Sequence, residues 1–138
     1  MLHLIEARGL SHAIEVDSAG TGGWHAGERA DPRSSKAAAA KGVKLPSRAR
    51  QFTAEDFARF DYVLAMDQSN FSDLKALDES AAEGRLFMFR SFDPTATGAP
   101  DVPDPYYGGP TGFDDVVDLC FRACEGLLDH VQTTLDPR

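Results

Sequence analysis

The feature that most constrains this chain is an alternation of short apolar runs with segments of helical periodicity. The clearest run is "DYVLAMD" at residues 61–67, which is almost continuously apolar, as is typical of a parallel strand covered on both faces. A further strand is expected at "RLFMF", residues 85–89, and an earlier one at Ile14–Ser18. Strands that alternate with helices predict an α/β fold with a parallel sheet and right-handed crossovers.

The segments between these runs carry helix start and stop signals. In "DPRSSKAAAAKG", Asp31 is expected as the N-cap, Pro32 in the first turn and Gly42 after the last turn. "TAEDFARF" places an acid three residues after Thr53, which is the pattern of a capping box. The final segment predicts a long helix with one apolar face. That face consists of Phe113, Val116, Val117, Cys120, Cys124, Leu127, Leu128 and Val131.

Composition excludes several classes of partner. The 138 residues fit one domain, and their net charge of −8 argues against a nucleic-acid or acidic membrane surface. No apolar run is long enough to span a bilayer, and no signal peptide is recognised. Cys120 and Cys124 share one helix face, which suits core side chains better than a disulfide framework. Because no signal peptide and no disulfide framework are expected, we expect a cytoplasmic, reduced protein. The four histidines lack ligand spacing, so we expect no metal site.

Polar residues follow the expected strands at their carboxyl ends, where parallel α/β sheets bind ligands. Asp17 and Ser18 end the strand expected at Ile14–Ser18, Asp67 follows "YVLAM", and the loop "DVPDPYYGG" carries Asp104. Pro105 biases Asp104 towards extended backbone and so sets the direction of its carboxylate. A simple surface turn is the alternative interpretation of this loop, but its place at the sheet edge favours a functional one.

Six stretches together resemble the low-molecular-weight protein-tyrosine phosphatases. They are "DSAGT", "GWHAG", "ADPR", "RARQ", "DYVLAMDQSN" and "VPDPYYGG", in the order and spacing of that family over nearly the whole chain. The resemblance implies a single domain over residues 1–138 with a flavodoxin-like fold. In the family this is a four-stranded parallel sheet in the order 2-1-3-4, with helices on both faces.

The resemblance also implies roles for individual residues. Asp104 matches the family's general acid, which protonates the leaving oxygen of a phosphomonoester and then accepts a proton from water. Tyr106, Tyr107 and Trp24 would form aromatic walls for a phenyl ring. Ser18 resembles a serine that supports the phosphate loop. The implied substrate is a phosphotyrosine protein or a small aryl phosphate, and no cofactor is implied.

Asp67 and Asn70 match the family's "MD-x-SN" stretch. We interpret this stretch as structural, with Asp67 as the N-cap of the helix that follows. A direct role of Asp67 in the site is the alternative.

The family's nucleophile, a cysteine in a C-x5-R loop, has no counterpart in this sequence. The sixth residue after Cys120 is Gly126 and the sixth after Cys124 is His130, so neither cysteine begins the motif. The glycine-rich "GTGGWHAG" lacks the Gly-Lys-Ser/Thr of a P-loop and does not fit G-x-G-x-x-G. We therefore expect this chain to be inactive by itself.

Met1 aligns inside the helix that follows the missing loop in the family, and that helix ends at Gly9. We expect an N-terminally truncated domain without its first strand, which is central in the order 2-1-3-4. The strands at Ile14–Ser18 and Tyr62–Met66 would then face a gap of roughly 10 Å, about twice the normal spacing. The lost burial, roughly 6–15 kcal/mol, is comparable with the whole stability of a domain. The isolated monomer is expected to be marginal or unfolded.

Three interpretations of the function remain. The favoured one is a tyrosine phosphatase whose nucleophile lies upstream of this sequence. A non-catalytic phosphatase-like protein could instead complete its sheet by forming a homodimer or by binding a strand of a partner. The third is a poorly folded product without a role.

Overall fold

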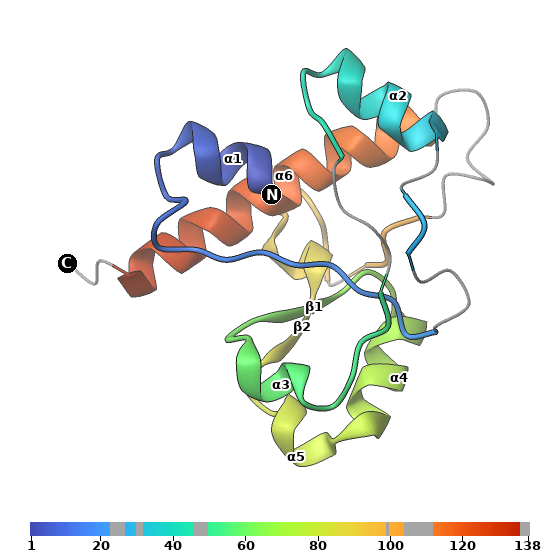
Figure 1. Ribbon diagram of the computed structural model, residues 1–138, viewed down its shortest axis with the longest axis vertical. Coiled ribbons are helices and arrows are strands. Elements are labelled where there is room, and N and C mark those ends of the chain that lie inside the picture. The colour runs from blue at the N-terminus through green and yellow to red at the C-terminus, as the bar shows by residue number, and fades with distance from the viewer. Residues whose placement is uncertain (23–26, 30–31, 46–49, 99, 104–111, 136–138) are drawn as a thin grey trace.

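A long C-terminal helix lies across one side of a small parallel sheet, and short helices cover the other side (Figure 1). The computed structural model describes residues 1–22, 27–29, 32–45, 50–98, 100–103 and 112–135. The elements are α1 (Leu2–Ala7), α2 (Pro32–Ala40), α3 (Asp56–Arg59), β1 (Val63–Ala65), α4 (Gln68–Leu77), α5 (Glu79–Ala82), β2 (Leu86–Met88), the 3-10 helix η1 (Phe89–Phe92) and α6 (Gly112–Leu135).

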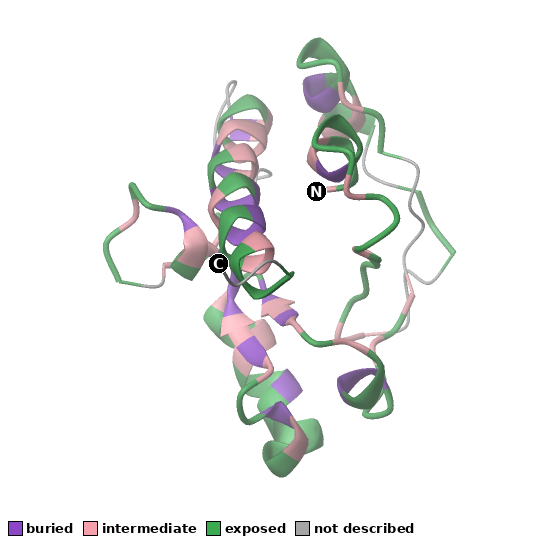
Figure 2. Cartoon of the chain, turned by 90° about the vertical axis from the view of Figure 1, so that its left-hand side faces the viewer, coloured by how far each residue is buried: buried purple, intermediate pink, exposed green. Residues whose placement is uncertain are grey.

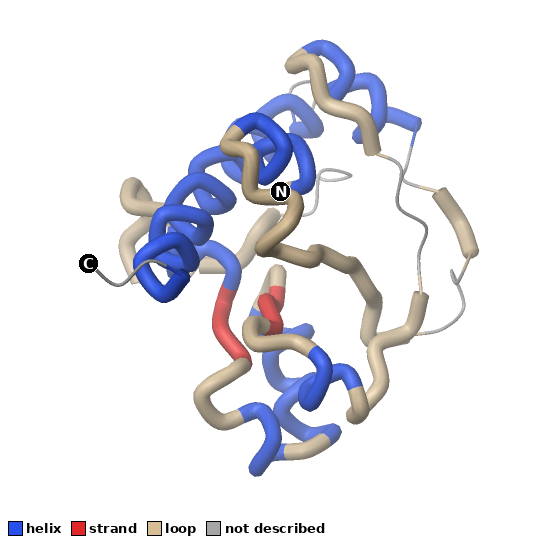
Figure 3. Tube along the Cα trace, turned by 60° about the vertical axis from the view of Figure 1, so that its left-hand side comes forward, coloured by secondary structure: helices blue, strands red, loops and turns tan. Residues whose placement is uncertain are grey.

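The sheet pairs β1 with β2 in parallel. Val63 lies opposite Leu86, and Ala65 lies opposite Met88. The helices form two layers, with α1, α2 and α6 on one side and α3, α4 and α5 on the other (Figures 1 and 3). This confirms the expected α/β fold with a parallel sheet between helices. The described sheet has two strands, so the order 2-1-3-4 and the absent first strand stay predictions.

Alternate residues of the strands reach two separate cores, as the two-residue period of a strand requires. On one face the buried residues are Phe57, Val63, Ala65, Leu74, Ala82, Leu86 and Met88. On the other face Leu64 packs with Phe89 of η1 and with Ala123, Cys124 and Leu127 of α6. The buried positions of α6 form a stripe along the helix (Figure 2). Cys124, Leu127 and Leu128 confirm the predicted face, whereas its other residues are half-buried, and the stripe also contains Leu119 and Ala123, which the prediction left out.

Most of the expected helix signals are confirmed. Pro32 is the first residue of α2, and Gly42 follows that helix with φ of 76°, in the left-handed region that favours glycine. The Asp67 side chain caps α4 by accepting a hydrogen bond from Asn70 N at 2.7 Å. The expected N-cap of α2, Asp31, lies outside the described residues.

The strand expected at Ile14–Ser18 is wrong. These residues are irregular chain that runs past the sheet without joining it (Figure 1). A strand is held by repeated backbone hydrogen bonds to a neighbour. Among the residues described, this part of the chain makes one isolated parallel bridge, in which Gly20 N donates to Arg50 O and Phe52 N donates to Gly20 O, both at 2.8 Å. The apolar alternation of Ile14 and Val16 predicts a strand, but an alternation by itself supplies no hydrogen-bonded neighbour, and these residues have none in the described sheet.

Gly126 is the point of closest approach between α6 and η1. A Cβ atom built at this position would overlap the carbonyl oxygen of Phe92 and touch Pro94. The helix and the backbone that follows β2 are therefore packed with no room for a side chain at this crossing. The requirement for glycine here is steric.

We predict that Gly126→Ala destabilises the protein. In an open helix interior this change is stabilising by about 1 kcal/mol, whereas overpacking costs about 1–3 kcal/mol, so the net effect should reverse sign. Urea unfolding at neutral pH measures it. Glu125→Ala, on the exposed neighbouring residue, is the control and should change stability little; a stabilised Gly126→Ala variant would contradict the packing described.

Candidate active site

Four of the five residues that the sequence assigns to a site lie outside the described residues. These are Trp24, Asp104, Tyr106 and Tyr107. Ser18 is described: it is exposed, and its backbone N–H donates to the Asp17 carboxylate at 2.8 Å. The structure thus gives the positions of the two segments that lead into the candidate site, residues 15–18 and residues 101–103.

Residues 101–103 form the stem of the loop that carries Asp104, and we call them the acid-loop stem. Val102 N donates to Met66 O at 2.7 Å, directly after the end of β1. The Val102 side chain is half-buried against the core that contains Phe89 and Leu127. The stem is therefore fixed at the carboxyl end of β1, the edge at which α/β sheets bind ligands.

Two further hydrogen bonds hold the acid-loop stem at Asp101. Its carboxylate accepts from the backbone N–H of Gln68, the first residue of α4, at 2.8 Å. Its backbone carbonyl accepts from Arg90 Nη1 at 3.0 Å. The residue after β1, the first residue of α4 and a residue of η1 thus all bind Asp101 or Val102, two to three positions before Asp104.

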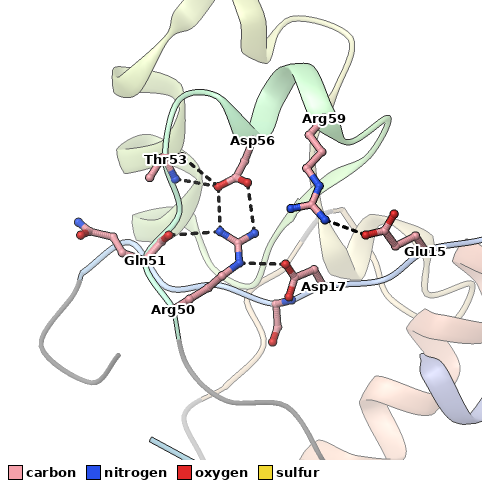
Figure 4. A network of polar contacts seen from close by, with 8 residues as sticks. Glu15, Asp17, Arg50, Gln51, Thr53, Asp56 and Arg59 are labelled. Atoms are coloured by element: carbon pink, nitrogen blue, oxygen red, sulfur yellow. Dashed lines mark hydrogen bonds and ion pairs between the residues drawn. The ribbon is translucent and has the colours of Figure 1, made fainter. Parts of the chain in front are cut away.

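A second cluster is centred on Arg50 (Figure 4). Its guanidinium makes a two-pronged contact with Asp56, at 3.0 Å from Nη1 and 3.3 Å from Nη2. Arg50 Nε donates to Asp17 at 2.9 Å. One arginine therefore connects the start of α3 to the segment that carries Ser18. Arg59 adds a more exposed ion pair with Glu15 at 2.8 Å.

The Arg50 cluster also explains how α3 begins. Asp56 accepts from Thr53 N at 2.9 Å, which is the reciprocal half of the capping box expected from the sequence. Hydrogen bonding from the Arg50 guanidinium, aided by Thr53 N–H, lowers the pKa of the Asp56 carboxyl below its ordinary value. Asp56 is 6% exposed, so its charge depends on these partners.

Comparison with known proteins identifies the family. A family model described as low molecular weight phosphotyrosine protein phosphatase matches residues 1–136. The chain belongs to this family. A low molecular weight protein-tyrosine-phosphatase of Streptomyces coelicolor is 44% identical over 138 residues, covering 97% of this chain and 83% of the relative. The human low molecular weight phosphotyrosine protein phosphatase is 35% identical, with coverages of 91% and 80%.

Solved structures agree with this assignment. A protein tyrosine phosphatase from Entamoeba histolytica, crystallised with Hepes in the active site, superposes with a TM-score of 0.88 at 34% identity, covering 96% of this chain and 84% of that one. YfkJ from Bacillus subtilis gives a TM-score of 0.86 at 32% identity, with coverages of 96% and 82%. The helices and parallel sheet described above are thus similar to those of a solved protein tyrosine phosphatase.

The two cysteines of this phosphatase-family chain are core side chains of α6. Cys124 is buried and Cys120 half-buried, and both are free thiols. Burial raises the pKa of Cys120 to about 11 and also raises that of Cys124. A reactive cysteine needs the opposite shift, so the geometry supports the packing role that the sequence indicated.

The described residues also bear on metal binding and on insertion into a membrane. No group of three or more His, Cys, Asp or Glu side chains in the part of the chain described is arranged to hold a metal ion. No helix within the described ranges is long and apolar enough to cross a membrane.

The sequence analysis missed three residues of these clusters. Arg50 enters the predictions from sequence only as part of the "RARQ" stretch, and no role is predicted for Asp101 or Arg90. Asp101 binds Gln68, which is 33 residues away in the sequence, and Arg90, which is 11 residues away. No local pattern reports such distant pairs. The one local signal is the repeated acid of "DVPD", Asp101 and Asp104, of which the family resemblance assigns a role only to Asp104.

We predict that Asp56→Asn weakens the fold at neutral pH and flattens its response to acid. A carboxyl whose folded pKa is lowered stabilises fully above its unfolded pKa of about 3.9 and loses this contribution as the pH falls through the folded value. The variant should lose about 2 kcal/mol at pH 7, since hydrogen bonds to charged groups are worth about 1.5–3 kcal/mol.

Urea unfolding at a series of pH values between neutral and strongly acidic tests this. Some acid sensitivity should remain in the variant, because the pKa of buried Asp93 is also lowered: desolvation raises it, but hydrogen bonds from Thr95 and the charges of Arg122 and Arg90 together outweigh this. Asp61→Asn removes an exposed carboxylate from the same region and serves as control. Equal acid sensitivity of Asp56→Asn and wild type would contradict the coupling to Arg50.

Proposed function

We propose that this chain forms part of a protein-tyrosine phosphatase that hydrolyses phosphomonoesters through a cysteinyl-phosphate intermediate. The observation that carries the proposal is the acid-loop stem, which is tied to Met66 and Gln68 at the carboxyl end of β1. The loop that begins two residues later bears Asp104. Membership of the phosphatase family over residues 1–136 supports the same reaction.

In this proposal Asp104 is the general acid. It protonates the leaving oxygen of the substrate while the phosphoryl group moves to a thiolate, and it then accepts a proton from the water that hydrolyses the phosphoenzyme. Tyr106, Tyr107 and Trp24 provide ring surfaces for a phosphotyrosine side chain or a small aryl phosphate. Ser18, at the end of the segment held by Arg50, supports the phosphate loop.

The nucleophile belongs to residues outside this sequence. The 138 residues contain two cysteines, and neither is followed by arginine at the sixth position. The chain alone is therefore proposed to be inactive. The complete domain would have a flavodoxin-like sheet in the order 2-1-3-4, with residues 1–138 as one truncated domain, and would work in the cytoplasm without a cofactor or metal.

The intact mass and N-terminal sequence of the protein purified from its native cell test the proposal first. We expect additional residues that contain a cysteine with an arginine six positions later. In that protein Asp104→Asn should lower kcat by about 10²- to 10⁴-fold for phenyl phosphate, the range of general acid catalysis. Asp73→Asn, on an exposed residue of α4, should retain full activity. A protein without the C-x5-R loop would exclude the proposed reaction.

A second candidate is a non-catalytic protein that completes its sheet by forming a homodimer or by binding a strand of a partner. The two-stranded sheet favours it, because parallel sheets this small rarely stand alone. A hollow of about 900 Å³ also lies between α1 and residues 11–16, lined by apolar side chains that include Ile5, Ile14 and Val16. An added strand would run beside residues 14–18, which belong to no strand of the described sheet.

The 138-residue chain decides between these candidates in solution. If it completes its sheet with a second copy, sedimentation equilibrium should give a dimer that unfolds cooperatively and whose stability rises with protein concentration. A stable, cooperatively folded monomer that binds no partner would contradict this candidate. An unfolded monomer would agree with a phosphatase domain that needs its missing strand.

A further inference from the structure

We propose that Asp101 is a positioning residue for the phosphatase reaction, and that it sets the place from which Asp104 reaches the substrate. The inference rests on the proposed function, because Asp101 would act only through Asp104. It goes beyond that function by assigning a role to a residue that is exposed and three positions away from the acid.

The first argument is that α4 does not need Asp101 as a cap. Asp67 already accepts from Asn70 N at 2.7 Å and occupies the N-cap position. Asp101 adds a second carboxylate at the same helix start, on Gln68 N at 2.8 Å, from a segment 33 residues later in the chain. A helix start offers several free N–H groups, so the second bond is available for holding another segment. What this bond specifically does is connect the acid-loop stem to α4.

The second argument is the number of restraints on two consecutive residues. Asp101 is held through its carboxylate by Gln68 N and through its carbonyl by Arg90 Nη1 at 3.0 Å. Val102 is held through its N–H by Met66 O at 2.7 Å and through its side chain by the core. Three hydrogen bonds, to Met66 after β1, to Gln68 of α4 and to Arg90 of η1, fix both the position and the direction of the stem.

The third argument is the short, stiff connection from the stem to the acid. Pro103 is the single residue between Val102 and Asp104. A proline ring fixes its own φ and restricts the residue before it, so the backbone through Val102 and Pro103 is stiff. A shift at Asp101 is therefore passed on to Asp104. Because a proton donor must lie within hydrogen-bond reach of the leaving oxygen, such a shift would impair proton transfer.

The competing explanation is that Asp101 only stabilises α4. Asp78 offers a matched comparison, because its carboxylate accepts from Ala81 N at 3.0 Å and caps the neighbouring helix α5. Asp78→Ala and Asp101→Ala each remove one exposed aspartate that accepts a hydrogen bond from a backbone N–H at the start of a helix in the same layer. Only Asp101 is connected to the acid-loop stem.

The experiment measures kcat and KM of the protein expressed from its whole gene, with two aryl phosphates. Phenyl phosphate has a poor leaving group that needs a proton, and 2,4-dinitrophenyl phosphate has a good one that does not. Asp101→Ala should lower kcat/KM for phenyl phosphate, which reports phosphoryl transfer to the thiolate, about 10-fold or more, within the range of a 1 Å misplacement. With dinitrophenyl phosphate kcat/KM should stay within about two-fold, because phosphoryl transfer from this substrate needs no proton. The ratio of the two kcat/KM values is the readout, since kcat also contains the phosphoenzyme hydrolysis that Asp104 assists with either substrate.

Two further variants separate positioning from stability. Asp101→Asn retains an oxygen that accepts from Gln68 N, so it should restore most of the activity towards phenyl phosphate. Asp78→Ala should lower the unfolding midpoint without any dependence of kcat/KM on the leaving group. Equal losses of kcat/KM with both substrates in Asp101→Ala, or the same leaving-group pattern in Asp78→Ala, would overturn the positioning role.

Amide hydrogen exchange of Gln68 and Val102 in the same protein gives a readout that does not depend on activity. Both amides should be protected in wild type and in Asp78→Ala, and both should exchange faster in Asp101→Ala. An active wild type whose two amides are unprotected would overturn the proposal for Asp101 alone. A wild type with protected amides and no phosphatase activity would overturn the proposed function, and with it the catalytic part of this inference.

Discussion

Parallel pairing of β1 with β2 is the constraint on which the rest of the structure depends. Because strand side chains alternate between faces, each strand serves two cores at once, one beneath α3, α4 and α5 and one beneath α6. The carboxyl end of β1 then determines what lies next to it. The carbonyl of Met66 accepts a hydrogen bond from Val102 N–H, and Asp67 caps α4. The place of the acid-loop stem therefore follows from where β1 ends.

Charged side chains hold the N-terminal segment in place of strand hydrogen bonds. Residues 14–18 belong to no ladder, yet Asp17 and Glu15 are paired with Arg50 and Arg59. Arg50 is the more important of the two arginines, since one of its partners is the buried Asp56 and the other is half-exposed. Exposed pairs contribute little, whereas a pair with a buried carboxylate is costly to break. Asp56 fixes the Arg50 guanidinium, which then pairs with Asp17, while the backbone bonds of Gly20 to Arg50 and Phe52 hold the same segment two residues after Ser18.

Features that depend on residues close together in the sequence could be predicted, whereas features that depend on residues far apart in the sequence could not. Pro32, Asp67 and the apolar stripe of α6 act through neighbours a few residues away, and each was recognised correctly. Ile14 and Val16 alternate like a strand, but a strand also needs a partner, and no local pattern reports whether one exists. Asp101 and Arg50 act across distant parts of the chain, so their roles emerged only in three dimensions. Asp104, Tyr106, Tyr107 and Trp24 remain predictions from resemblance.

The anchoring of the acid-loop stem also has a consequence for how this region could vary among related proteins. The stem is held by Met66, Gln68 and Arg90, all of which precede the connection that begins at Asp93. Residues inserted into or deleted from that connection would change its outer path while its end point remained fixed. Such a chain could acquire new surface features between η1 and the stem without moving its acid.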